Sequence, residues 1–214
     1  MKNIALALLF FFSTTIYSQD NQWPGVPLLD ESGIVLMDQT TFVGLISVAA
    51  LSYGLTKFVF KENETLNFYQ VRAGVFGTEG GTVVMENFGI EKRLAPWFGL
   101  GLEINNQQWI YEEKNGAGMG FNTYYRWHLL GKKKISPYIE YGAGFFFGFS
   151  DFPPNGTNFT FNLTTQVGAE YTFEDQNKLR LGYGHIHQSN NELLDPNPGE
   201  DGNGLNITYL WFWQ

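Results

Sequence analysis

The chain has 214 residues, a formal net charge of -8 and no cysteine, with 17% aromatic residues and 25 glycines. This length fits one domain, the scattered basic residues give no electrostatic footprint for nucleic acid, and the absence of cysteine excludes disulfides, thiolate metal sites and lipid attachment through cysteine. The surplus of glycine and aromatic residues favours closely paired strands with aromatic girdles over a helical protein.

The N-terminus has the pattern of an export signal. Lys2 precedes an apolar run from Ile4 to Phe12, and Ser18 provides a small residue for cleavage before Gln19. The apolar run is too short to cross a bilayer as a helix. We therefore predict a signal peptide over residues 1–18 and a mature chain that starts near Gln19.

Residues 19–65 form a leader that does not follow a strand pattern. Pro and Gly residues punctuate its first part. Residues 41–60 are nearly continuously apolar, with Lys57 as their only charge, and are long enough for a membrane helix. Because Gly and Ser residues dilute this segment, we interpret it as a helix or an irregular strand packed at the periplasmic end of the domain that follows.

From about residue 66 onward, alternating or aromatic-rich segments are separated by Gly, Pro, Asn or charged residues. We predict strands over residues 66–76, 82–94, 97–110, 117–130, 136–149, 158–173, 178–189 and 203–213. Most reach the roughly 9–11 residues that a tilted transmembrane strand needs, and an even number suits a closed barrel. The predicted fold is therefore all-β, an eight-stranded antiparallel transmembrane barrel over residues 66–214.

The connections between these strands predict an orientation in the bacterial outer membrane. We expect longer loops and tighter turns to alternate, the loops over residues 112–116, 151–157 and 190–202 and the turns over residues 95–96, 131–136 and 174–177. Outer-membrane barrels have longer loops outside and short turns in the periplasm. With both termini in the periplasm, the end of the seventh strand faces the cell exterior.

The seventh strand ends in side chains that fit acyl-transfer chemistry. Residues two apart in a strand share a face, so His185, His187 and Ser189 continue the face of Leu181 and Tyr183. That face begins apolar, and we expect it to be the lipid-facing wall. A base and a hydroxyl are two of the three groups that acyl transfer through serine needs.

The third group follows the loop Pro196-Asn197-Pro198-Gly199. Hairpin closure brings the residues that flank a loop close together, so Asp201, with Glu200 as the alternative acid, can orient the imidazole of His187 toward Ser189. A bare His-x-Ser is a weak motif. Ordinary polar residues at a membrane interface are the competing interpretation of these side chains.

These residues resemble the signature of a known family. The run His187-Gln188-Ser189-Asn190, followed by Pro196-Asn197-Pro198-Gly199 and an acid, is similar to that of the lipid A 3-O-deacylases, also called outer-membrane acyloxyacyl hydrolases. Residues 137–144, 152–159 and 166–171 resemble the strands and loop that precede the active site in that family. The resemblance covers the C-terminal third to half of the chain. It implies a serine ester hydrolase whose partner is lipid A, in lipopolysaccharide.

The resemblance also implies a role for each residue of the site. The base falls on His187, the nucleophile on Ser189 and the acid on Asp201, where the best-known members have glutamate. Asn190 takes an orienting or oxyanion role. The family usually continues with Ala-Gly, whereas this chain has Asn191-Glu192, a departure that bears on an oxyanion donor in the backbone of this loop.

Two other functions fit the same pattern. A structural or adhesive barrel without catalysis would use the loop after Ser189 only as a surface hairpin, and a phospholipase would apply the same chemistry to another lipid. A porin is disfavoured because side chains fill the interior of an eight-stranded barrel. No cofactor follows from the scheme, and a homodimer is left open.

The remaining histidines and the lysine run receive no catalytic role. We interpret His185 as an interfacial packing residue, and His128 lies at the end of the fourth predicted strand. We expect no metal site, because three isolated histidines without carboxylate support do not make one. The run Lys132-Lys133-Lys134 is interpreted as a solvated turn.

Overall fold

The computed structural model describes residues 66–112, 114–152, 156–190, 196 and 198–213. The predicted signal peptide, the leader with its apolar segment, and the Asn191-Glu192 pair lie outside these residues. In the part of the chain that is described, no helix has both the length and the apolar character needed to cross a membrane.

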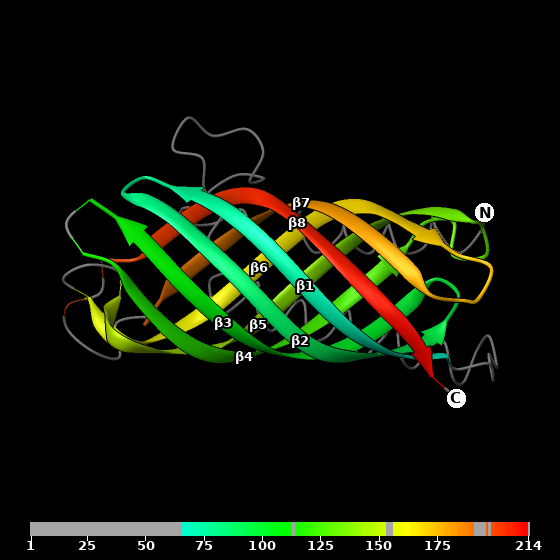
Figure 1. Cartoon of the computed structure of the whole chain (residues 1–214), viewed down its shortest axis with the longest axis horizontal. Helices are drawn as coiled ribbons and strands as arrows, with labels where there is room; N and C mark the ends of the chain where they lie inside the picture. The colour runs from blue at the N-terminus through cyan, green and yellow to red at the C-terminus, as the bar shows by residue number, and fades with distance from the viewer. Residues whose placement is uncertain (1–65, 113, 153–155, 191–195, 197, 214) are drawn as a thin grey trace, which may run out of the picture. The chain divides into compact units, whose positions relative to one another are not determined.

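The described residues form a closed antiparallel barrel in which each strand pairs with its neighbours in the chain and β1 pairs with β8 (Figure 1). The strands are β1 (Leu66–Thr78), β2 (Gly81–Ala95), β3 (Phe98–Tyr111), β4 (Gly116–His128), β5 (Ile135–Phe152), β6 (Thr157–Thr172), β7 (Lys178–Ser189) and β8 (Glu200–Trp213). Closure leaves no unpaired sheet edge exposed to lipid. The predicted fold class is confirmed.

Several strands are longer than predicted, and this changes the connections. β5 reaches Phe152, and β8 begins at Glu200 because its pairing with β7 continues to the pair Gln188 and Glu200. One end of the barrel has connections at residues 79–80, 112–115, 153–156 and 190–199, and the other has 96–97, 129–134 and 173–177. The predicted alternation of long loops and tight turns is therefore wrong. We call these ends the Ser189 end and the Trp213 end.

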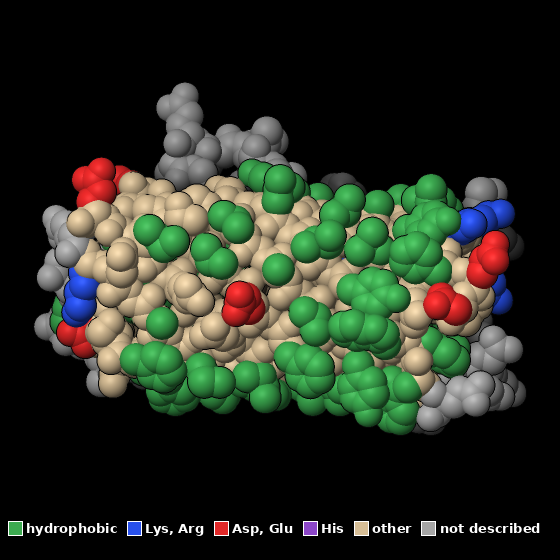
Figure 2. Space-filling model, in the orientation of Figure 1, with side chains coloured by type: hydrophobic (Ala, Val, Ile, Leu, Met, Phe, Trp, Pro, Cys, Tyr) green, Lys and Arg blue, Asp and Glu red, His purple; other side chains and the backbone are tan. Residues whose placement is uncertain are grey.

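Side chains alternate between an apolar outside and a filled inside. In β7, Arg180 and Gln188 are fully buried, whereas Leu181 and Tyr183 are 59% and 50% exposed. Hydrophobic side chains are spread along the visible wall, and most charged side chains lie toward the two ends (Figure 2). This separation of faces is the pattern of a barrel that spans a membrane.

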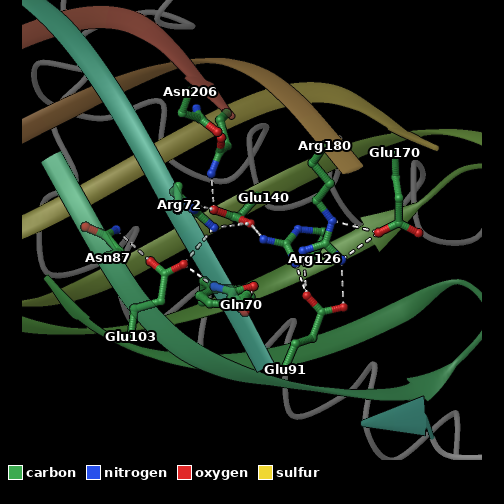
Figure 3. A network of polar contacts seen from close by, with 12 residues as sticks. Gln70, Arg72, Asn87, Glu91, Glu103, Arg126, Glu140, Glu170, Arg180 and Asn206 are labelled. Atoms are coloured by element: carbon green, nitrogen blue, oxygen red, sulfur yellow. Dashed lines mark hydrogen bonds and ion pairs between the residues drawn. The ribbon is translucent and has the colours of Figure 1, made fainter. Parts of the chain in front are cut away.

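The middle of the interior is a network of paired charges (Figure 3). Arg126 of β4 contacts Glu91 of β2 and Glu140 of β5, and Arg180 of β7 donates to Glu91 at 2.7 and 2.9 Å. Arg180 also donates to Glu170 of β6 at 2.6 Å. All five side chains are buried. Because a buried charge is tolerated only when it is paired, these contacts connect strands on different sides of the barrel.

Nearer the Ser189 end, the interior contains a cluster of apolar and aromatic side chains. Trp109 stacks on Phe152 with ring centroids 3.9 Å apart and meets Phe146 edge-on at 5.1 Å. The same buried cluster includes Ile186, which lies between His185 and His187 in β7. The inner side of β7 is thus packed against neighbouring side chains where its outer side carries the two histidines.

Replacement of Arg126 by methionine should destabilise the barrel. It leaves the carboxylates of Glu91 and Glu140 each without one cationic partner, and breaking a buried ion pair in this way costs about 3–5 kcal/mol. Urea unfolding in detergent, followed by tryptophan fluorescence, measures the loss. Glu174→Gln, at an exposed turn residue, is the control and should leave the unfolding free energy unchanged. An equal effect of both substitutions would contradict the structural role of the network.

Candidate active site on the outer wall

The polar end of β7 lies on the outer face of the barrel. Alternation along the strand puts His187 and Ser189 on the side of the exposed Leu181 and Tyr183. Neighbouring side chains nevertheless cover most of His187, whose side chain is only 12% exposed. The outward position predicted from the spacing of these residues is where the structure places them.

The beginning of β8 brings a carboxylate to this face. Asp201 lies directly opposite His187 in the register of β7 and β8, and such opposite side chains are immediate neighbours. Asp201 Oδ1 lies 2.8 Å from His187 Nδ1, and His187 Nε2 lies 3.1 Å from Ser189 Oγ. The imidazole therefore bridges the carboxylate and the hydroxyl, with one contact at each nitrogen.

These contacts fix which nitrogen of a neutral His187 carries the proton. An ionised carboxylate only accepts hydrogen bonds, so Nδ1 carries the hydrogen and donates to Asp201. Nε2 is then left as an acceptor for the hydroxyl of Ser189. In this state the imidazole is arranged to take the hydroxyl proton.

Glu200, the alternative acid, is directed elsewhere. It is opposite Gln188 in the register, and consecutive residues of a strand point to opposite faces. Its side chain interacts with Tyr111, which belongs to the buried cluster inside the barrel. The structure thus brings Asp201, and not Glu200, to His187.

Asn190 ties together the segments around the end of β7. Its side chain is buried, and its Nδ2 donates to Thr157 Oγ1 and to the carbonyl oxygen of Pro196, both at 3.2 Å. Thr157 is the first residue of β6, and Pro196 belongs to the connection between β7 and β8. Of the two roles expected for Asn190, these contacts support the orienting one.

His185 makes contacts that the sequence analysis missed. Its Nε2 lies 3.2 Å from Asp201 Oδ1, and its Nδ1 lies 3.2 Å from Asn203 Oδ1. The spacing of the residues could have predicted the contact between His185 and Asp201. A residue two before His187 shares its face, and it is the diagonal neighbour of Asp201 across a β7–β8 hairpin. The exact register, however, depends on where β8 begins.

Phenylalanines flank the site on the outer face. Phe161 of β6 is opposite Ser189 in the register, and its ring is 5.2 Å from that of Phe159. Phe159 in turn lies 5.2 Å from Phe147 of β5. Ser189 is therefore next to an aromatic surface suited to contact with hydrocarbon chains.

The other residues considered in the sequence lie apart from this site. His128 is inside the barrel, 3.9 Å from Glu170. Lys132, Lys133 and Lys134 line a cavity of about 460 Å³ at the Trp213 end. Within the described ranges, no group of three His, Cys, Asp or Glu side chains is arranged to hold a metal ion.

Comparisons with known proteins agree with this architecture. The family model described as Lipid A 3-O-deacylase (PagL) matches residues 83–209. The crystal structure of the outer membrane enzyme PagL is 18% identical, with a TM-score of 0.54 over 65% of this chain and 97% of that one. Neisserial surface protein A (NspA) is 10% identical, with a TM-score of 0.54 over 67% of this chain and 96% of that one. At these identities the two structures establish a common fold. Among curated proteins, no sequence matches.

Gly199 should resist replacement because of its backbone conformation. Its φ is +63°, in the left-handed region, and no atom lies within 4 Å of a Cβ added there. Gly199→Ala should therefore lower the unfolding free energy by the backbone term alone, about 1–2 kcal/mol. Gly77→Ala, where the nearest atom is 4.0 Å away and φ is not positive, is the control. Equal stability of the two variants in urea would show that Gly199 is not constrained by its backbone.

Proposed function

The chain belongs to the lipid A 3-O-deacylase family, and on this premise we propose that it removes an ester-linked acyl chain from lipid A. The protein is an outer-membrane barrel of that family. The observation that carries the proposal is the set of contacts from Asp201 through His187 to Ser189 on the lipid-facing wall. Besides the lipid ester, the proposed reaction takes only water from outside the chain.

The first half of the reaction acylates Ser189. His187 Nε2 takes the hydroxyl proton as Ser189 Oγ attacks the ester carbonyl, which forms a tetrahedral oxyanion. Asp201 accepts the Nδ1–H hydrogen bond and stabilises the imidazolium. When the oxyanion collapses, the bond to the sugar oxygen breaks and His187 returns its proton to that oxygen. The products of this half are the deacylated lipid alcohol and an acyl ester on Ser189.

The second half regenerates the enzyme with water. His187 Nε2 takes a proton from water while the water oxygen attacks the acyl ester, and the second tetrahedral species expels Ser189 Oγ. The imidazolium returns its proton to Oγ, and a fatty acid leaves. Each half therefore uses the same base in the same orientation, and Asp201 does not need to change its protonation state.

The position of the site supports a substrate that lies in the membrane. The hydroxyl of Ser189 is on the outer face, beside Phe161 and near the Ser189 end of β7, so an ester at the boundary between headgroup and acyl chains can reach it without entering the barrel. We propose that the Ser189 end faces the cell exterior, where lipid A is found. The connection at residues 190–199 is the longest between the described strands, which suits that side.

The oxyanion requires hydrogen-bond donors, and the side-chain amide of Asn190 next to Ser189 is directed to Thr157 and Pro196 instead. We propose that Asn190 orients the end of β7 through its contacts with Thr157 and Pro196, and that a backbone N–H beside Ser189 donates to the oxyanion. One such donor is typically worth about 10²–10³ in turnover. Asp201, His187 and Ser189 come from one closed barrel, so the proposed chemistry does not require a homodimer.

The alternative functions are less well supported. A structural or adhesive barrel gives no reason for a carboxylate, an imidazole and a hydroxyl to contact one another in that order on a wall rich in apolar side chains. A phospholipase would use the same three residues, and only the substrate distinguishes it from the proposed activity.

Ser189→Ala should abolish deacylation. Without Oγ no acyl ester forms, and loss of a serine nucleophile lowers turnover by about 10⁴-fold or more. Mass spectrometry of lipid A from cells that express each protein provides the measurement, and Ser150→Ala in β5 is the control. Identical acylation with the wild type and Ser189→Ala would reject the proposal. Purified protein supplied with lipid A and with phospholipid in parallel separates the two substrate classes.

Asp201→Asn should impair catalysis far more than Glu200→Gln. The amide of the introduced asparagine can donate to His187 Nδ1, which favours the tautomer with the hydrogen on Nε2. In that tautomer Nε2 cannot accept the proton of Ser189, a change that costs up to about 10⁴-fold in turnover. Glu200 faces the other side of β8, so its substitution should alter the rate by less than about threefold. Fatty-acid release by the purified variants measures both effects. A larger loss with Glu200→Gln would reassign the acid.

A further inference from the structure

Two polar side chains on the outer wall have no role in the reaction described above. His185 and Asn203 lie opposite one another in the register of β7 and β8, on the face that carries Tyr183 and Leu205, which are 50% and 68% exposed. Polar groups facing lipid are costly unless they are hydrogen-bonded. Their presence beside the site therefore calls for a physical reason.

The contacts of Asp201 provide one. A single carboxylate oxygen, Oδ1, lies 2.8 Å from His187 Nδ1 and 3.2 Å from His185 Nε2. The two imidazoles approach it from the same strand, two residues apart. The Asp201 side chain is 24% exposed and sits just after the β7–β8 connection, so its contact with His187 alone would leave it free to turn toward water.

The proton arrangement of His185 is compatible with an electrostatic contact to Asp201. Because a carboxylate only accepts, the Nε2 that faces it must carry a hydrogen. In the neutral tautomer, Nδ1 is then an acceptor, which the amide N–H of Asn203 can satisfy after a half-turn of that amide. In the charged form, Nδ1 donates to the Asn203 oxygen instead. In both states Asn203 holds the ring, and Nε2 keeps a 3.2 Å electrostatic contact with the carboxylate.

We propose that His185 is a positioning residue that holds the Asp201 carboxylate against His187, with Asn203 fixing the orientation of the His185 ring. The inference rests on the proposed serine hydrolase function and adds a second support for its acid. Ile186, between the two histidines, packs in the buried cluster inside the barrel, so the backbone that presents both rings is held from the other side. The polar contacts of the His185 ring are with Asp201 and Asn203, and its role in the reaction is through Asp201.

The test compares His185→Phe with wild type by two rates. One is the covalent labelling of Ser189 by a fluorophosphonate, which requires an activated hydroxyl but no lipid, and the other is fatty-acid release from lipid A. Loss of this polar contact, which leaves the Asp201 carboxylate with one partner fewer, should slow both about 10-fold to 100-fold, with KM for lipid A unchanged. His185→Gln, which can keep an N–H near Asp201, should recover most of the labelling rate. Tyr183→Phe, on the same face, is the matched control and should not change either rate.

A double-mutant comparison separates positioning from general damage. In an Asp201→Asn background, the carboxylate that His185 holds is absent, so His185→Phe should change the labelling rate by less than about twofold. An additive loss in that background would overturn the proposal, as would a labelling rate for His185→Phe equal to wild type. Circular dichroism checks that each variant keeps its strands, and His185→Leu is measured alongside as a second apolar variant in case the phenylalanine does not fold.

The two rates also distinguish failure of this inference from failure of the proposed function. Wild-type protein that labels at Ser189 but leaves lipid A intact contradicts the proposed substrate, and the labelling comparison still decides the role of His185. Wild-type protein in which Ser189 does not label contradicts both. Slower labelling in His185→Phe, normal labelling in Tyr183→Phe and recovery in His185→Gln together support the positioning role.

Discussion

The whole structure depends on the pairing of every strand with two neighbours in a closed sheet. A sheet in lipid must satisfy its backbone groups internally, which closure of β1 on β8 achieves. Closure also divides the side chains strictly into an inside and an outside. Charged residues such as Arg126 are paired in the interior, where Glu91 and Glu140 meet them, and a polar group within the apolar wall needs a partner on its own strand or the next.

The outer cluster around Asp201 follows from this division. Residues 185, 187 and 189 share a face because they alternate, and the antiparallel register of β8 supplies Asp201 and Asn203 as their partners. Each polar group in the set therefore has a neighbour within hydrogen-bonding distance, although the surrounding wall is apolar. The same register that satisfies these groups also aligns a carboxylate, an imidazole and a hydroxyl in the order that serine acyl transfer uses.

The interior of β7 explains why such a cluster can be held in place on an outside surface. Gln188 donates to Gln107 of β3 at 2.8 Å, and Ile186 packs among the aromatic side chains near Trp109. Residues that alternate with the histidines are thus anchored inside the barrel. A rigid strand is a better support for a catalytic arrangement than a loop, and here all three residues lie within strands, with Ser189 the last residue of β7 and Asp201 the second of β8.

The sequence by itself determined the strand number, the outward face of His187 and Ser189, and the resemblance of their surroundings to a family, because a period of two and a local motif are properties of consecutive residues. It did not determine where strands end, so the loop alternation was wrong and Glu200 remained a competitor for Asp201. Nor did it reveal the second contact of Asp201 with His185. Only the tertiary structure decided these points, because they depend on the register between β7 and β8, which is set by pairing around the entire closed barrel and not by either strand alone.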